Sequence, residues 1–263
     1  IILFLLFSQT KIQEFVQLLS NANYKYFIIS IILYILGQVI SSKKWMILSK
    51  QLNFENTFAQ YLKWYFLGMF YNTFLPTNIG GDVIKIYKLK DKKPLALDRA
   101  IISVLSDRIT GLIILLGFIL FGASFYNKTI ICRLTVIAII ISTIIGLIII
   151  RILKKMITQD KYKRIYNLIT LLFERLCIIK ISILSITFHI LLITLHFLIA
   201  QIYNLQIPLK YYFLLYPITA ILASLPISIN GMGIKELAYV FMLKKYNIDT
   251  SSALLFAMTF NMV

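Results

Sequence analysis

Charged side chains stand within or beside strongly apolar stretches of this chain, where each charge needs a partner. Asp107 and Arg108 lie inside the apolar stretch 100–125. Placing such a side chain in a bilayer costs about 2.5–3.5 kcal/mol on insertion scales, so it normally faces a cavity or an opposite charge. Carboxylates can hold a cationic head group or a proton, and ammonium or guanidinium groups can hold a phosphate. The candidate carboxylates are Asp82, Asp107 and Glu236, and the candidate cations are Lys85, Arg108 and Lys235.

The adjacent pair Asp107 and Arg108 cannot neutralise itself, because neighbouring helical residues point about 100° apart. Asp107 shares a polar stripe with Ser103 and Thr110, which we expect to face the interior of a helix bundle. Arg108 must then look elsewhere, toward Asp82 or Glu236. The alternative to a binding role is a structural ion pair that locks the bundle.

Two related glycine motifs supply most of the other candidates. Leu, Pro, Ile, Gly, Ile and Lys recur between 75–85 and 225–235 at a constant offset of 150 residues (75 against 225). Glycine lets the backbone turn and present N–H groups at a helix start, a geometry that binds anions such as a lipid phosphate. The alternative is a plain turn. We expect no catalytic residue, metal or cofactor, and the predicted head-group site comprises Asn72, Pro76, Gly80, Gly81, Asp82, Lys85, Asp107, Arg108, Pro226, Asn230, Gly231, Gly233, Lys235 and Glu236.

Each motif closes an apolar, aromatic run, over 61–76 and 211–226. Such runs are marginal for crossing a hydrocarbon core about 30 Å thick. Short hydrophobic segments broken by Gly or Pro at matching positions of two halves are typical of a transporter binding site. Asp98 and Asp249 follow the two motifs and are expected to be helix N-caps.

Composition places these elements in a membrane. The 263 residues are 60% hydrophobic and 14% charged, with a mean hydropathy of +0.86, which predicts an all-α polytopic bundle of about 6–8 transmembrane helices. Spanning candidates are 24–40, 100–125, 134–150 and 181–203. The basic residues that give the net charge of +17 lie between apolar runs rather than along one face, which argues against a nucleic-acid partner. Cys132 and Cys177 suggest neither a disulfide framework nor a metal site.

Lysine and arginine counts orient the chain. They place loops 41–60, 77–99 and 151–180 in the cytoplasm, provided that 61–76 enters and leaves on one side. A full crossing by 61–76 remains the alternative. Three crossings separate the two short segments, so the second re-entrant segment opens from the opposite face and the repeat is inverted.

The domain organisation follows from this repeat. We expect one transmembrane domain over 1–263, truncated at both ends, with halves of about 24–125 and 181–263. Residues 126–180 join the halves and include a basic amphipathic cytoplasmic helix over 157–180. His189 and His196 share a helix face and are expected to make interhelical hydrogen bonds, while Trp45 and Trp64 are expected to be interfacial anchors.

Three further stretches carry a family resemblance: Phe70 to Pro76 followed by Gly80-Gly81-Asp82, Ser103 to Leu112, and the segment from Leu225 to Glu236. They resemble the lysylphosphatidylglycerol synthase transmembrane (flippase) domain family, of which this chain looks like a stand-alone member. The resemblance implies a bundle of about eight helices in the bacterial cytoplasmic (inner) membrane, whose best-known relatives move aminoacylated phospholipids between leaflets. Lys85 and Lys235 stand where that family usually has Arg, and Asp107 where Glu is common.

The sequence therefore favours a lipid translocase or lipid-binding transporter for a phospholipid, an aminoacyl-phospholipid or a glycolipid. Its partners would be membrane lipids and a separate lipid-synthesising enzyme. One alternative is a membrane enzyme of lipid-linked sugar or polyprenyl metabolism, but the chain has no Asp-x-Asp, Gly-x-Ser-x-Gly or P-loop motif and no aminoacyl-transfer domain. We therefore expect that it is not an enzyme. The other alternative is a non-catalytic assembly factor.

Overall fold

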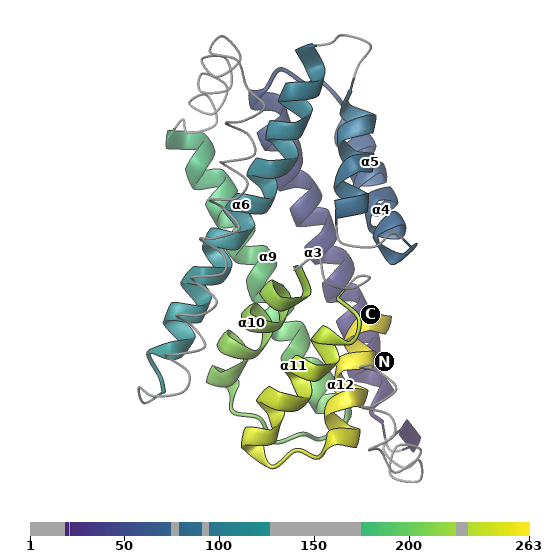
Figure 1. The fold of residues 1–263 in the computed structure, drawn as a ribbon, viewed down its shortest axis with the longest axis vertical. Coiled ribbons are helices and arrows are strands. Elements are labelled where there is room, and N and C mark those ends of the chain that lie inside the picture. The colour runs from purple at the N-terminus through teal and green to yellow at the C-terminus, as the bar shows by residue number, and fades with distance from the viewer. Residues whose placement is uncertain (1–18, 21, 75–78, 91–94, 127–174, 225–230) are drawn as a thin grey trace.

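The computed structural model describes residues 19–20, 22–74, 79–90, 95–126, 175–224 and 231–263, and these residues fold into helices without a strand. The predicted all-α membrane fold is confirmed. Figure 1 shows the elements in chain order. They are α3 (Tyr24–Gln51), α4 (Phe58–Phe74), α5 (Ile79–Leu89), α6 (Leu95–Ala123), α9 (Arg175–Ile202), η1 (Leu209–Tyr211), α10 (Tyr212–Ser224), α11 (Ile234–Leu243), η2 (Lys244–Tyr246) and α12 (Thr250–Met262).

Among the described residues, three helices are long and apolar enough to cross a membrane, over Tyr24–Gln51, Leu97–Ala123 and Cys177–Ile202. They confirm three of the predicted spans, while 134–150 and most of the predicted helix 157–180 lie outside the described residues. The expected loop over 41–60 is wrong in its first part, since α3 continues to Gln51. Four of the polar residues there, Ser41, Ser42, Lys44 and Ser49, are buried in the bundle rather than hydrated.

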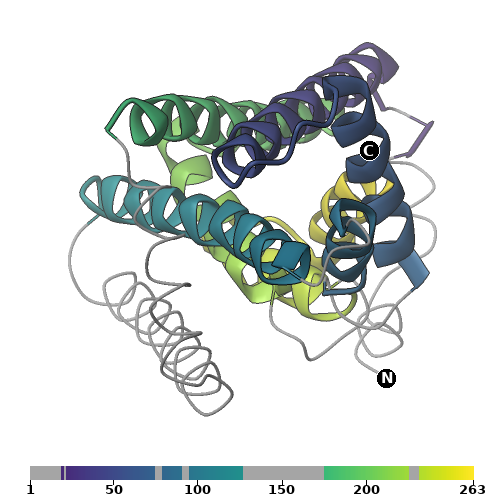
Figure 2. The same cartoon turned by 90° about the horizontal axis from the view of Figure 1, so that it is seen from above.

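The long helices form the frame on which the short ones pack. Gly37 of α3 faces Phe188 of α9, whose ring would lie in ordinary van der Waals contact, at 3.5 Å, with a Cβ added at residue 37. In the view along the long axis, α3 lies alongside α9 and α6 lies opposite them (Figure 2). One hydrophobic cluster joins α9 to α10, α11 and α12, and a second surrounds Trp45 and Tyr61 between α3, α4 and α6.

The helices α4 and α5 form a hairpin that opens beside the N-terminal end of α6. The Ser49 and Ser103 hydroxyls are 2.6 Å apart, so the C-terminal end of α3 lies beside the N-terminal end of α6. The chain from 52 to 94 therefore leaves and returns at the same end of the bundle, in the upper half of Figure 1. This geometry favours the re-entrant alternative over a full crossing by α4.

The helices α10 and α11 form a second hairpin, which opens at the other end of α6. The Tyr211 ring at its start lies 4.6 Å from the Tyr246 ring at its finish. Both tyrosines contact Tyr126, which follows the last turn of α6. The two hairpins thus open toward opposite ends of the same spanning helix (Figure 1). That the two sequence halves form an inverted repeat stays a prediction.

Candidate functional site

The closed end of the α4–α5 hairpin is built on an asparagine and two glycines. Asn72 Oδ1 accepts a hydrogen bond of 2.6 Å from the Gly81 backbone N–H. A Cβ at Gly81 would collide with the Gly68 carbonyl oxygen and come within 2.8 Å of the Asn72 amide. Glycine at position 81 lets α5 begin in contact with the backbone of α4. The motif therefore does more than form a plain turn.

The first charged pair at this closed end joins Asp82 of α5 to Arg108 of α6. Arg108 Nε and Nη2 donate to Asp82 Oδ2 and Oδ1, each at 2.9 Å, in a bidentate arrangement. Of the two partners that the sequence allowed for Arg108, the structure selects Asp82. The Arg108 side chain remains 49% exposed, so a ligand can approach the guanidinium.

The second charged pair joins Asp107 to Lys44 of α3, a partner that the sequence reading missed. Lys44 Nζ donates to the Asp107 backbone oxygen at 3.0 Å and makes an ion contact of 2.9 Å with Oδ1. Both side chains are buried, at 6% and 7% exposure. Ser41 and Trp45 flank Lys44 at helical spacing and are buried too, a signal that α3 continues past residue 40.

Lys85 is the third cation of this group. Its ammonium lies 3.8 Å from the centre of the Tyr65 ring and 5.4 Å from that of Trp45, and the residue is 5% exposed. Aromatic faces hold such a cation through their quadrupole. The expectation that Trp45 is an interfacial anchor is wrong, since this side chain is fully buried and packs edge-on against Tyr61.

These five side chains form what we call the first polar cluster: Lys44, Asp82, Lys85, Asp107 and Arg108. Three cations face two carboxylates, which leaves one positive charge in excess within the cluster. Arg108 stands 11 residues after Leu97, the first residue of its span. At a rise of about 1.5 Å per residue this is roughly 16 Å, close to the middle of a 30 Å hydrocarbon core. The cluster can therefore attract an anion to membrane depth.

The closed end of the α10–α11 hairpin has a different polar structure. Gly231 and Gly233 adopt φ angles of 75° and 85°, which favour glycine. Glu236 binds neighbouring protein groups. Its carboxylate accepts from the Gly233 N–H at 2.6 Å and from the Asn261 amide at 2.6 Å, which caps the start of α11. Lys235 donates to Asn261 Oδ1 at 2.7 Å.

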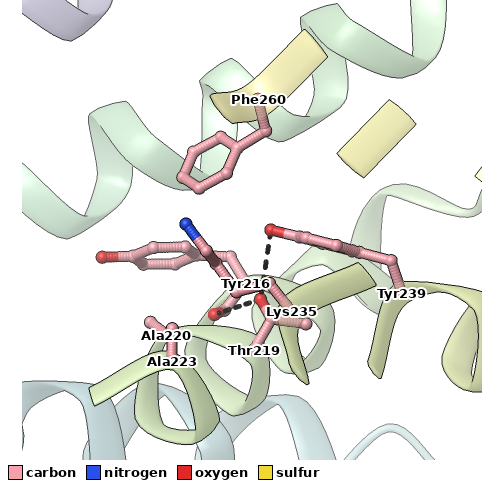
Figure 3. Close-up of a pocket in the computed structure, with 7 residues that line it drawn as sticks. All are labelled: Tyr216, Thr219, Ala220, Ala223, Lys235, Tyr239 and Phe260. Atoms are coloured by element: carbon pink, nitrogen blue, oxygen red, sulfur yellow. Dashed lines mark hydrogen bonds between the residues drawn. The ribbon is translucent and has the colours of Figure 1, made fainter. Parts of the chain in front are cut away.

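A cavity of about 100 Å³ lies at this second closed end. Figure 3 shows the Lys235 ammonium pointing into it, between the rings of Tyr216 and Phe260. Thr219 and Tyr239 contribute hydroxyls, and two alanines complete the lining. A cavity of this volume fits one small polar group beside the ammonium rather than a complete sugar or aminoacyl head group.

Histidines connect the two closed ends through α9. His189 Nδ1 lies 2.8 Å from the Tyr216 hydroxyl, and its Nε2 lies 3.2 Å from the Gly111 carbonyl oxygen on α6. A carbonyl only accepts, so Nε2 of the neutral ring carries the proton and Tyr216 donates to Nδ1. The expected interhelical hydrogen bonding of His189 is confirmed. A Cβ added at Gly111 would lie 3.7 Å from Lys44 Nζ, so Gly111 is next to the first polar cluster. Its bond to His189 therefore places the cavity beside that cluster.

His196, seven residues after His189 on α9, makes a corresponding bond to Tyr239. Its Nδ1 lies 2.7 Å from the Leu192 carbonyl and therefore donates, so Nε2 accepts from the Tyr239 hydroxyl at 2.7 Å. The Tyr239 proton is thus committed to histidine. With the Tyr216 proton also committed to His189, the Lys235 ammonium is the main donor that faces the cavity.

The predicted site residues thus fall into two neighbouring groups rather than one ring of ligands. Asn72, Gly81, Asp82, Lys85, Asp107 and Arg108 come together at the first closed end, with the half-buried Gly80 beside them. Gly231, Gly233, Lys235 and Glu236 come together at the second. Pro76, Pro226 and Asn230 lie outside the described residues.

Comparisons with known proteins show the family to which the chain belongs. The model of the family described as "Lysylphosphatidylglycerol synthase TM region" matches residues 1–263. A UPF0104 membrane protein of Pyrococcus horikoshii is 26% identical over 57% of this chain and 45% of its own length. A UPF0104 membrane protein of Methanocaldococcus jannaschii is 28% identical over 45% of this chain and 35% of its own length. The chain thus matches less than half the length of these relatives. No solved structure matches it.

Proposed function

The chain belongs to the lysylphosphatidylglycerol synthase TM region family, and from that premise and the site geometry we propose that it is a membrane lipid translocase. The proposed substrate is a phospholipid, an aminoacylated phospholipid or a glycolipid, moved between leaflets without a chemical step. One observation carries the proposal. Two hairpins open toward opposite ends of α6, and their charged closed ends lie side by side at membrane depth.

The geometry supports a route in which the head group moves and the acyl tails stay in the bilayer. Irregular backbone and charged groups at membrane depth are tolerated where they line a protein-covered or water-filled path. A lipid phosphate drawn by the excess positive charge of the first polar cluster competes with Asp82 for the exposed guanidinium of Arg108. The Lys44–Asp107 pair is buried and keeps α3 and α6 together during the exchange.

The same proposal includes the orientation. The end of the bundle at which the α4–α5 hairpin opens faces the cytoplasm, in accord with the Lys and Arg counts of 41–60, 77–99 and 151–180. The α10–α11 hairpin then opens to the other side, and the halves 24–125 and 181–263 form an inverted repeat in the cytoplasmic membrane. With this arrangement the site can be reached alternately from the two sides of the membrane.

Reconstituted vesicles test the proposal. The purified chain is inserted into liposomes that contain a head-group-labelled fluorescent phospholipid, aminoacylated phospholipid or glycolipid, one class at a time, and an impermeant reductant reports the label that reaches the outer leaflet. We expect protein-dependent transfer, measured with and without an imposed membrane potential. Arg108→Gln should slow it about tenfold or more, since a charged hydrogen bond to the head group contributes about 1.5–3 kcal/mol.

The matched control is Lys88→Gln. Lys88 is an exposed cation at the far end of α5, whose recorded ring contact is with its neighbour Tyr87. It should leave transfer unchanged. Equal transfer by wild-type protein and Arg108→Gln, or no protein-dependent transfer of any of the three lipid classes, would contradict the proposal.

A further inference from the structure

A second basic and aromatic cluster lies at the open end of the α10–α11 hairpin, far from both closed ends. It comprises Tyr126, Lys210, Tyr211, Lys245 and Tyr246, contributed by the end of α6, by η1 and by η2. All five lie outside the spanning segments. Tyr126 follows the span Leu97–Ala123 by three residues, which places the cluster at the level where a membrane meets water.

The ammonium groups of Lys210 and Lys245 both lie over the Tyr126 ring. Lys245 Nζ lies 4.5 Å from the centre of the Tyr126 ring and Lys210 Nζ lies 5.6 Å from the same centre. The two cations are therefore at most 10.1 Å apart, the sum of those distances, which is about one Debye length at 0.1 M salt. No carboxylate of the described residues is recorded with either lysine. An anion between them would relieve their mutual repulsion.

The tyrosines add a directed donor. Tyr246 donates to the Tyr126 hydroxyl at 3.2 Å, and the Tyr211 hydroxyl donates to the Met242 carbonyl at 2.8 Å. Because the Tyr126 hydroxyl accepts from Tyr246, its own proton can be donated to another acceptor. Burial raises the pKa of Tyr126 above its usual value of 10.0, so this phenol stays protonated at neutral pH. One hydroxyl and two ammonium groups thus meet around a single ring.

We propose that this cluster binds the phosphate of an anionic phospholipid head group at the membrane interface. Basic pockets between transmembrane helices bind such head groups through charge, and aromatic rings fix their depth. Inorganic phosphate offers the same oxyanion but lacks the acyl chains that bring a lipid to this level. The alternative is that the rings merely anchor the two lysines without a ligand. The proposal does not rest on lipid transport.

Lipid-dependent thermal stability of the purified full-length chain tests this site. The unfolding temperature is measured in mixed micelles with increasing phosphatidylglycerol, with phosphatidylcholine, or with inorganic phosphate, and its dependence on lipid gives an apparent affinity. We expect tighter binding of phosphatidylglycerol than of phosphatidylcholine. Lys245→Gln should weaken phosphatidylglycerol binding about fivefold, the factor that corresponds to about 1 kcal/mol per lysine.

Lys244→Gln is the matched control, because Lys244 is its exposed neighbour and has no recorded contact with the rings of the cluster. It should leave the affinity nearly unchanged. If Lys245→Gln lowers the lipid-free unfolding temperature, Tyr126→Phe keeps the ring, removes the donor and should weaken binding about two- to tenfold. Equal affinity for the two lipids, an equal loss for both lysine variants, or displacement of phosphatidylglycerol by inorganic phosphate would overturn the proposal.

Discussion

The Lys44–Asp107 pair allows a sharp test of which charges hold the bundle together. The two side chains are 6% and 7% exposed and meet at 2.9 Å. Removing one partner of such a pair leaves an uncompensated buried charge, which costs about 3–5 kcal/mol, whereas replacing both by apolar groups of similar volume is often neutral or stabilising. We therefore expect Lys44→Met to destabilise the protein by about 3–5 kcal/mol. The double variant with Asp107→Leu should recover most of that loss.

Asp82→Asn provides the comparison, because its partner Arg108 is 49% exposed. On the water-filled path that we propose, an accessible pair such as this one contributes about 0–1 kcal/mol, so this variant should cost much less than Lys44→Met. The assay is the free energy of unfolding in mixed micelles, measured for each single variant and for the double variant as a thermodynamic cycle. Additive effects in the Lys44–Asp107 cycle, or an equal cost for Asp82→Asn, would refute the reasoning.

Three other local features are tested by the same unfolding assay. Gly81→Ala should destabilise the α4–α5 hairpin by about 1–3 kcal/mol, since its Cβ meets the backbone of α4, whereas Gly117→Ala in α6 has open space and should be neutral or slightly stabilising; equal effects would contradict the close approach. Tyr239→Phe removes the donor to His196 Nε2 and should cost about 0.5–2 kcal/mol, with no loss counting against that bond. Asp249→Ala removes the cap on the Ser252 N–H and should cost about 1 kcal/mol, while Asp249→Asn keeps an acceptor and should cost less.

The spanning helices α6 and α9 could be predicted because their apolar composition alone determines them. The stretches 100–125 and 181–203 are predominantly apolar, and both lie largely within spanning helices of the structure. The charge of Arg108 also limited its partners to a few carboxylates, one of which it contacts. Asp249 is the N-cap that its position before α12 suggested. Asp98 lies within the first turn of α6 instead, because that helix begins at Leu95.

The partner of Asp107 could not be predicted in the same way. The residues from Ser41 to Lys44 are polar and basic, a composition typical of a cytoplasmic loop. In the structure Ser41 contacts Tyr65 of α4 and Lys44 contacts Asp107 of α6, so burial replaces the hydration that the composition suggested, while Lys43 stays exposed. The spacing of Ser41, Trp45, Leu48 and Leu52 was the available signal, since these residues lie on one buried helix face.

The closed ends of the hairpins show a second limit. The repeat of Gly and Lys suggested that both motifs bind a ligand in the same way. The structure gives them different local chemistry, because Glu236 caps its own helix whereas Asp82 pairs with a neighbouring one. Which side chain a carboxylate meets depends on the packing of helices distant in sequence, and one motif does not contain that information.

The central claim is that the two hairpins open on opposite sides of the membrane, and labelling of single cysteines tests it most directly. In a variant with Cys132→Ser and Cys177→Ser, one cysteine is introduced at Glu55, at Lys90 or at Lys244, which are exposed at the open ends of the hairpins. An impermeant maleimide is then applied from one side of sealed vesicles. We predict that Glu55→Cys and Lys90→Cys react from the same side and that Lys244→Cys reacts from the other. Reaction of Glu55→Cys and Lys90→Cys from opposite sides, or of all three from one side, would contradict the account.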